Sequence, residues 1–314
     1  MSLKRKPETI PLKNLPRGGT IGVTAPASPV KEDQLNRGVS YLEKLGYRVH
    51  VGKTCYSKEN YVAGDDHLRA TELMNFIHDP DIDAIFCARG GYGTIRILDR
   101  LDYQEIRKAR KLLVGFSDIT ALQWAIYAQT GLITVSGGMV ATDMAELPVD
   151  EQFESCFWEL MNNGIYSYDL SHGQEQQQEI SGKGIAGTLS MGAKLLGTPY
   201  VPNLRDSILL LEDVQEPYHK IEGYLMQFLL SGAFKKLKAI MVGEFTKVKK
   251  NEYKEVPALN DIFHYIFDRV QVPVITGVPY GHIPSKIPLP VGATLSLSLG
   301  PTSQLKTQES IFEH

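Results

Sequence analysis

The sequence predicts an α/β fold with two domains, the first of which contains a parallel sheet. From residue 20 onward, short runs rich in β-branched residues alternate with longer stretches of helical period, which is typical of parallel strands joined by crossover helices. The chain has 314 residues, and a domain usually spans about 100–200 residues. A polar stretch at 165–183 interrupts the pattern near its middle.

The first half is expected to form five β–α units. In the first helix, Leu35, Val39 and Leu42 fall on one face, and Gly46 follows where a helix stop is expected. Pro80 is expected to end the second helix, because the residue before a proline disfavours helical backbone. The expected strands are 20–24, 47–51, 83–88, 112–116 and 132–135, and the expected helices are 31–45, 68–78, 94–101, 118–129 and 149–162.

The second half is expected to be smaller and mixed. Its expected strands are 184–189, 207–211, 239–242, 272–276 and 293–297, and its expected helices are 218–230 and 259–270. The stretch 165–183 contains a run of Gln and Glu and almost no core residues, so it is predicted to be a polar linker or a lid. His172 lies in it and could reach a site only if the stretch folds over. We therefore expect domains at 1–164 and 184–314, separated by 165–183.

Charge and cysteine content exclude several classes of protein. The 33 Lys and Arg residues nearly balance 36 Asp and Glu residues, whereas a nucleic-acid binder usually shows a basic excess. No run approaches the roughly 18 apolar residues of a membrane helix. The three cysteines lie far apart without a C-x-x-C pair, which indicates buried thiols in a reducing compartment. We expect a cytoplasmic protein that binds neither nucleic acid nor membrane.

One strand leads directly into a serine that opens a helix. The segment 112–120 runs through Gly115 to Ser117 and Asp118, the layout of a nucleophile elbow, in which a sharp turn lifts the hydroxyl out of the sheet. Ile119 stands where the usual G-x-S-x-G motif has its second glycine. An ordinary helix N-cap at Ser117 explains the same pattern, so both interpretations stay open.

A second strand ends in a glycine-rich turn at 88–94. Glycines at this position let the backbone approach a ligand closely, and N–H groups at a helix start stabilise negative charge. The spacing fits neither a dinucleotide-binding motif nor a P-loop, and a simple tight turn explains it equally well.

Two polar residues of the second half complete a set for acyl transfer. Glu212 ends an apolar strand, and His282 lies in a loop rich in Gly and Pro. Acyl transfer needs a hydroxyl, an imidazole that takes and returns its proton, and a carboxylate that fixes the imidazole tautomer. Ser117, His282 and Glu212 supply these groups. The remaining histidines show no metal-ligand spacing, so no metal site is expected.

Several motifs resemble the LD-carboxypeptidases, a family of serine peptidases that also includes the microcin C immunity peptidases. The segments 83–93 (DAIFCARGGYG) and 115–118 (GFSD) carry the resemblance. Further matches follow in order at 24–28, 63–70, 197–200, 210–213, 281–282 and 289–292, so the resemblance covers nearly all of residues 20–300. The stretches 136–138 and 186–189 depart from the family pattern, and neither contains Ser117, Glu212 or His282.

The resemblance implies both a site and a fold. It implies a triad in the chain order Ser117, Glu212, His282, with oxyanion-binding N–H groups from Asp118 and Gly91. It further implies a flavodoxin-like parallel-sheet N-terminal domain, a smaller β-rich α/β C-terminal domain, an active site between them, a homodimer and no cofactor.

The activity that the resemblance implies is release of terminal D-Ala from murein tetrapeptides, small peptides of cell-wall recycling. Two alternatives stay open: a peptidase that cleaves a peptidyl- or aminoacyl-nucleotide amide, and a non-catalytic two-domain binder of a small ligand. Arg89 is a candidate for binding the D-Ala carboxylate, and a structural hydrogen-bonding role explains it as well.

Overall fold

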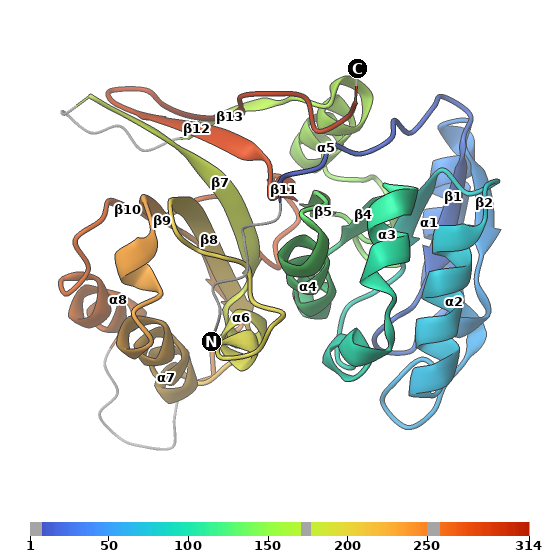
Figure 1. Cartoon of the computed structure of the whole chain (residues 1–314), viewed down its shortest axis with the longest axis horizontal. Helices are drawn as coiled ribbons and strands as arrows, with labels where there is room; N and C mark the ends of the chain where they lie inside the picture. Colours follow the sequence, from blue (N-terminus) through green and yellow to red (C-terminus); the bar gives the residue numbers. More distant parts are fainter. Residues whose placement is uncertain (1–7, 171–176, 250–257, 314) are drawn as a thin grey trace.

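The protein contains two sheets, and the computed structural model describes residues 8–170, 177–249 and 258–313 (Figure 1). The first sheet has six strands in the order β11-β5-β4-β3-β1-β2. Strands β1 to β5 pair in parallel, and β11 is antiparallel to β5. The strands are β1 (Thr20–Thr24), β2 (Arg48–Val51), β3 (Ala84–Cys87), β4 (Leu112–Gly115), β5 (Thr134–Ser136) and β11 (Leu289–Val291).

Helices cover both faces of this sheet. The helices are α1 (Glu32–Lys44), α2 (Asp66–His78), α3 (Tyr103–Ala109), α4 (Thr120–Thr130) and α5 (Glu151–Asn163). Helix α3 contacts both α2 and α4, so these three form one layer. On α5, Trp158 contacts Tyr41 of α1 and stacks on Tyr47, which joins α5 to α1. The parallel, doubly covered sheet confirms the α/β fold expected for the first half.

The second sheet has seven strands in the order β10-β9-β8-β7-β12-β13-β6. Strands β7 to β10 are parallel and the others antiparallel, which is the mixed arrangement expected for this half. The strands are β6 (Ser167–Leu170), β7 (Gln178–Thr188), β8 (Ser207–Val214), β9 (Ala239–Thr246), β10 (Val274–Ile275), β12 (Thr294–Leu299) and β13 (Ser303–Thr307), and the helices are α6 (Leu189–Leu195), α7 (Tyr218–Leu230) and α8 (Leu259–Phe267).

The prediction of a polar linker at 165–183 is wrong for most of the described part of that stretch. Strand β6 and the first half of β7 lie there and pair with β13 and β12. These strands form an extended ribbon whose backbone hydrogen bonds need few apolar side chains, and Tyr166, Leu170 and Ile180 are buried. His172 and the start of the Gln and Glu run lie outside the described residues.

The two halves of the chain are interlocked. Strand β11 comes from the last 30 residues and completes the first sheet beside β5. Between the sheets, Trp124 Nε1 of α4 donates to the Ala186 carbonyl of β7 at 2.8 Å. Near the start of the chain, Ile10 and Leu12 bridge Leu132 and Phe312. Groups from the two sheets are therefore held in a fixed relation to each other.

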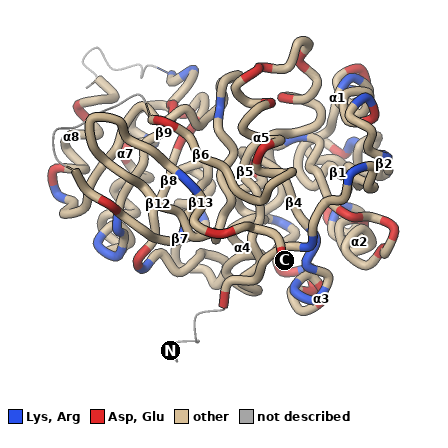
Figure 2. Tube along the Cα trace, turned by 90° about the horizontal axis from the view of Figure 1, so that it is seen from above, with Lys and Arg blue, Asp and Glu red and all other residues tan. Residues whose placement is uncertain are grey.

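Over the part of the chain that the structure describes, basic and acidic residues are interspersed without a stripe of one sign, as Figure 2 shows. Among the described helices, none is long and apolar enough to cross a membrane.

Candidate active site

Ser117 occupies the sharp turn between β4 and α4. Its φ is +65°, a left-handed conformation that few non-glycine residues adopt. Such strain is found mainly where function requires it. Gly115 is required two residues earlier, because a Cβ there would lie 2.6 Å from the Ile119 side chain. The Ser117 hydroxyl hydrogen-bonds to His282, and Ser117 provides no side-chain cap at the start of η4 (Ser117–Ile119) or α4. The structure therefore favours the nucleophile elbow over the N-cap.

The structure brings the three predicted residues together in one hydrogen-bonded series. His282 Nε2 lies 3.0 Å from Ser117 Oγ, and His282 Nδ1 lies 2.8 Å from Glu212 Oε2. Glu212 is fully buried, and its other oxygen accepts from Thr188 Oγ1 at 2.6 Å. Because the Glu212 carboxylate can only accept, Nδ1–H of a neutral imidazole donates to Glu212 Oε2, and its Nε2 lone pair faces the serine hydroxyl.

An irregular register between β8 and β9 lies beside Glu212. One residue separates Leu211 from Asp213 in β8, whereas two separate their partners Val242 and Phe245 in β9, so the extra residue lies in β9. Adjacent side chains of a strand point to opposite faces, and both Glu212 and Asp213 are buried, so β8 is covered on both faces here. Gly243 of β9 lets the His282 loop approach, because a Cβ there would overlap the Tyr280 carbonyl and lie 3.2 Å from Glu212 Cβ.

The glycine-rich turn lies against the serine. A Cβ on Gly90 would lie 2.8 Å from Ser117 Cβ, and Gly91 has φ +114°, where its Cβ would overlap Ser28. The buried carboxylate of Asp118 accepts from Thr94 N at 2.9 Å and so joins this turn to the serine turn. Burial raises the pKa of Asp118. Gly91 and Asp118, the two predicted oxyanion residues, thus line the same cavity as Ser117.

Two cavities meet at the histidine. One, of about 410 Å³, contains the glycine turn and Ser117, and the other measures about 860 Å³. They share Met139, Thr142, Lys247 and His282, so an elongated molecule could pass the serine with one end on each side.

The smaller cavity carries cations that the sequence did not single out. Lys194 at the end of α6 and Lys247 just beyond β9 line it together with Arg89. No motif marks either lysine, and only the packing of the two sheets brings them to the serine. Arg89 Nη1 donates to the Pro29 carbonyl at 2.8 Å, so part of the guanidinium supports the loop after β1.

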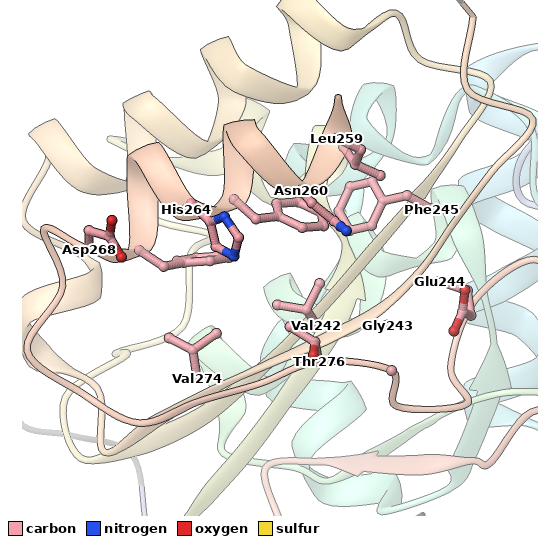
Figure 3. A pocket seen from close by; sticks show the side chains of 13 residues that line it. Val242, Gly243, Glu244, Phe245, Leu259, Asn260, His264, Asp268, Val274 and Thr276 are labelled. Atoms are coloured by element: carbon pink, nitrogen blue, oxygen red, sulfur yellow. The ribbon is translucent and has the colours of Figure 1, made fainter. Parts of the chain in front are cut away.

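A third cavity, of about 620 Å³, lies between α8 and strands β9 and β10 (Figure 3). His264, Asn260 and Asp268 reach into it from α8, opposite Val242 and Thr276. Its lining includes neither Ser117 nor His282. Within the described ranges, no group of three or more His, Cys, Asp or Glu side chains could hold a metal ion.

Asp213 gives the site a pH-dependent contribution to stability. Burial, with a smaller effect from the charge of Glu212, raises the pKa of Asp213 to about 6 from 3.8. The folded protein thus holds the Asp213 proton more tightly than the unfolded chain does. The stability that this proton contributes is lost as pH rises from about 4 to 6.

Asp213→Asn cannot titrate at this position. As pH rises through that window, we expect the free energy of unfolding of the variant to increase by about 3 kcal/mol relative to that of the wild type. The figure corresponds to roughly two pKa units at about 1.36 kcal/mol each. Urea unfolding of both proteins from pH 4 to 7.5 measures the difference. A difference that stays constant with pH would contradict the assignment.

A serine hydroxyl, an imidazole and a buried carboxylate joined by hydrogen bonds form the arrangement found in serine hydrolases. Residues 21–137 match the LD-carboxypeptidase N-terminal domain, and residues 181–297 match the LD-carboxypeptidase C-terminal domain. The chain belongs to the LD-carboxypeptidase family, whose members are serine-type hydrolases, which confirms the resemblance seen in the sequence.

Named relatives fall in both branches of this family. The probable murein peptide carboxypeptidase of Bacillus subtilis is 32% identical, over 95% of this chain and 92% of the relative. The crystal structure of muramoyltetrapeptide carboxypeptidase from Oxalobacter formigenes superposes with a TM-score of 0.84 at 30% identity, covering 92% of this chain and 99% of that one. The microcin C7 self-immunity protein MccF of Escherichia coli is 28% identical, over 89% of this chain and 90% of the relative.

Proposed function

We propose that this protein is a serine LD-carboxypeptidase that releases terminal D-Ala from murein tetrapeptides, with Ser117, His282 and Glu212 as its catalytic triad. The observation that carries the proposal is the pair of contacts at the imidazole, 3.0 Å to Ser117 Oγ and 2.8 Å to Glu212 Oε2. The relatives named for murein peptides supply the substrate class.

Acylation begins when the Ser117 hydroxyl attacks the carbonyl of the bond before D-Ala. His282 Nε2 takes the hydroxyl proton, and Glu212 stabilises the imidazolium through Nδ1–H. The backbone N–H groups of Asp118 and Gly91 are suited to the developing oxyanion. His282 then gives the proton to the leaving nitrogen, the C–N bond breaks, and D-Ala departs from an acyl-enzyme.

Hydrolysis of the acyl-enzyme follows the same route in reverse. A water molecule attacks the ester carbonyl while His282 Nε2 takes one of its protons, and the imidazolium returns that proton to Ser117 Oγ. The products are the shortened peptide and the free enzyme. The smaller cavity contains the carboxyl groups of Asp118, Asp213 and Glu216 beside three cationic side chains, Lys194, Lys247 and Arg89. These cations are the candidates to bind the terminal carboxylate of such a peptide.

The non-catalytic binder explains fewer of the observations. A binder needs neither the left-handed backbone of Ser117 nor a hydrogen-bonded series ending at its hydroxyl. The nucleotide alternative keeps the same chemistry, and the MccF relative is the reason to test it. A base would be expected to stack on an exposed aromatic ring. Of the two aromatics in 165–183, Tyr166 is buried and Tyr168 is half-buried.

A direct comparison of substrates tests the proposal. The purified protein is incubated with a murein tetrapeptide and, separately, with an aminoacyl-sulfamoyl adenosine, and products are identified by mass spectrometry. We expect kcat/KM for the tetrapeptide to exceed that for the nucleotide. The reverse order would assign the protein to the immunity branch, and turnover of neither would support the binder.

We further propose that residues 1–164 and 184–314 act as two domains and that the protein works as a homodimer in the cytoplasm. Two separate sheets support the domains, although β11 crosses between them. Three buried cysteine thiols suit a reducing compartment. Light scattering on the eluting peak of a sizing column distinguishes a dimer of about 70 kDa, twice the chain mass of 35.0 kDa, from a monomer.

A further inference from the structure

A buried ion pair lies behind the catalytic histidine. Lys286 is 3% exposed, and its ammonium lies 2.5 Å from Asp143 Oδ1. Asp143 comes from the first half of the chain, and its other oxygen accepts from Met139 N at 2.9 Å. Burying a charge is costly unless it is paired. A lysine that is buried here therefore needs a structural or functional reason, unlike a lysine on the surface.

The ion pair contacts the histidine through one ring. The Lys286 ammonium lies 4.4 Å from the centre of the Phe116 ring, within the range of a cation–π contact. Phe116 immediately precedes the serine, and its ring centre lies 5.0 Å from that of His282. Lys286, Phe116 and His282 are thus packed in series, and the last of them hydrogen-bonds to Ser117.

The loop that carries His282 is otherwise closed and attached at its ends. Ile287 N donates to the Pro279 carbonyl at 2.8 Å, which closes the loop. Tyr280 OH contacts Ser136 Oγ at 2.7 Å, on the β5 side. Between these attachments, the imidazole is positioned by Glu212 on one edge and by Phe116 on a neighbouring side.

We propose that the Lys286–Asp143 pair is a positioning element that holds the Phe116 ring, and through it the imidazole of His282, at hydrogen-bonding distance from Ser117. This inference rests on the proposed function, and it adds two residues that line the larger cavity and act on the reacting atoms only through Phe116 and His282. It makes the histidine loop, which lies between β10 and β11 in the chain, dependent on Asp143 of the first half.

Lys286→Met tests the proposal because it keeps an unbranched side chain only one atom shorter and removes its charge. We expect kcat for D-Ala release to fall about 10–100-fold, since a small misplacement of a catalytic group has effects of this size. KM should change less than threefold, roughly the scatter of such comparisons. Asp143→Asn should act alike, and the double variant should be no worse than the single ones, because the two residues act as a unit.

Lys111→Met is the matched control. Lys111 is also a buried lysine, 8% exposed, whose ammonium donates to the Phe76 carbonyl at 2.8 Å, and it precedes β4 at the opposite end of that strand from Ser117. The same chemical change there should lower thermal stability and leave kcat unaltered. Equal losses of kcat in both variants, or a raised KM with unchanged kcat in Lys286→Met, would overturn the positioning role.

A spectroscopic readout separates this inference from the proposed function. The Nδ1 proton between His282 and Glu212 should give a downfield proton NMR signal that disappears in Glu212→Gln. We expect this signal to shift or broaden in Lys286→Met and to stay unchanged in Lys111→Met. If the wild type releases no D-Ala, the proposed function fails, but the NMR signal still tests whether Lys286 positions His282. An unchanged signal in Lys286→Met would refute the positioning role.

Discussion

Ser117→Ala should stop D-Ala release almost completely, with kcat lower by about four to six orders of magnitude. In the proposed mechanism the hydroxyl oxygen forms the acyl-enzyme, and Ser117 holds it 3.0 Å from His282 Nε2 in a left-handed backbone conformation. Alanine removes one oxygen and adds no bulk to the cavity. The KM for the peptide should therefore remain near that of the wild type.

Ser231→Ala is the control for this variant. Ser231 is exposed and its hydroxyl donates to the Phe228 carbonyl at the end of α7, away from the cavities that meet at His282. Its kcat should match the wild type in an assay of free D-Ala. A Ser117→Ala enzyme that retained more than about 1% of wild-type turnover would exclude Ser117 as the nucleophile, given the losses typical of such enzymes.

His282→Ala should be nearly as damaging, with kcat lower by about four to six orders of magnitude. Without the imidazole, the serine hydroxyl loses the base that accepts its proton, and the leaving nitrogen loses its acid. Because the two residues act as a unit, the Ser117→Ala/His282→Ala double variant should be no slower than either single variant.

His264→Ala provides the comparison, since His264 is an exposed histidine in the cavity beneath α8. Its variant should keep full turnover in the same steady-state assay. Losses that added fully in the double variant would mean that Ser117 and His282 act independently, against the proposed triad.

The sequence predicts the parallel sheet well because its strands are short apolar runs that end in clear turn signals. Strand β1 has its expected bounds, and α7 matches its expected range. The same reasoning selects Ser117 directly after a strand, Glu212 at the expected end of another strand and His282 in a loop. In the structure, β8 continues past Glu212 to Val214. That the three meet is a property of tertiary structure, which the resemblance anticipated and the residue pattern alone did not.

Other features depend on pairing between distant segments. Strands β6 and β7 look like a linker because backbone pairing, and not apolar alternation, holds them in the sheet. The range 94–101 forms two short 3-10 turns, η2 (Thr94–Arg96) and η3 (Leu98–Arg100), because Thr94 is engaged by Asp118 from the serine turn. The register shift of β9 beside Glu212 has no local signal.

The ion pair behind the histidine has the same origin. Lys286 and Asp143 lie 143 residues apart and belong to no shared motif. Each reads as an ordinary surface charge in its own segment. Only the packing of the histidine loop against the first half of the chain buries them together.

The most direct test of the central claim uses a murein tetrapeptide that carries an isotope label in its terminal D-Ala. Mass spectrometry of the reaction mixture follows the label after incubation with the wild-type protein. We predict labelled free D-Ala and an unlabelled tripeptide in equal amounts, with a tetrapeptide ending in L-Ala left intact. A label that stays on the peptide, or a cut at any other bond, would contradict the account.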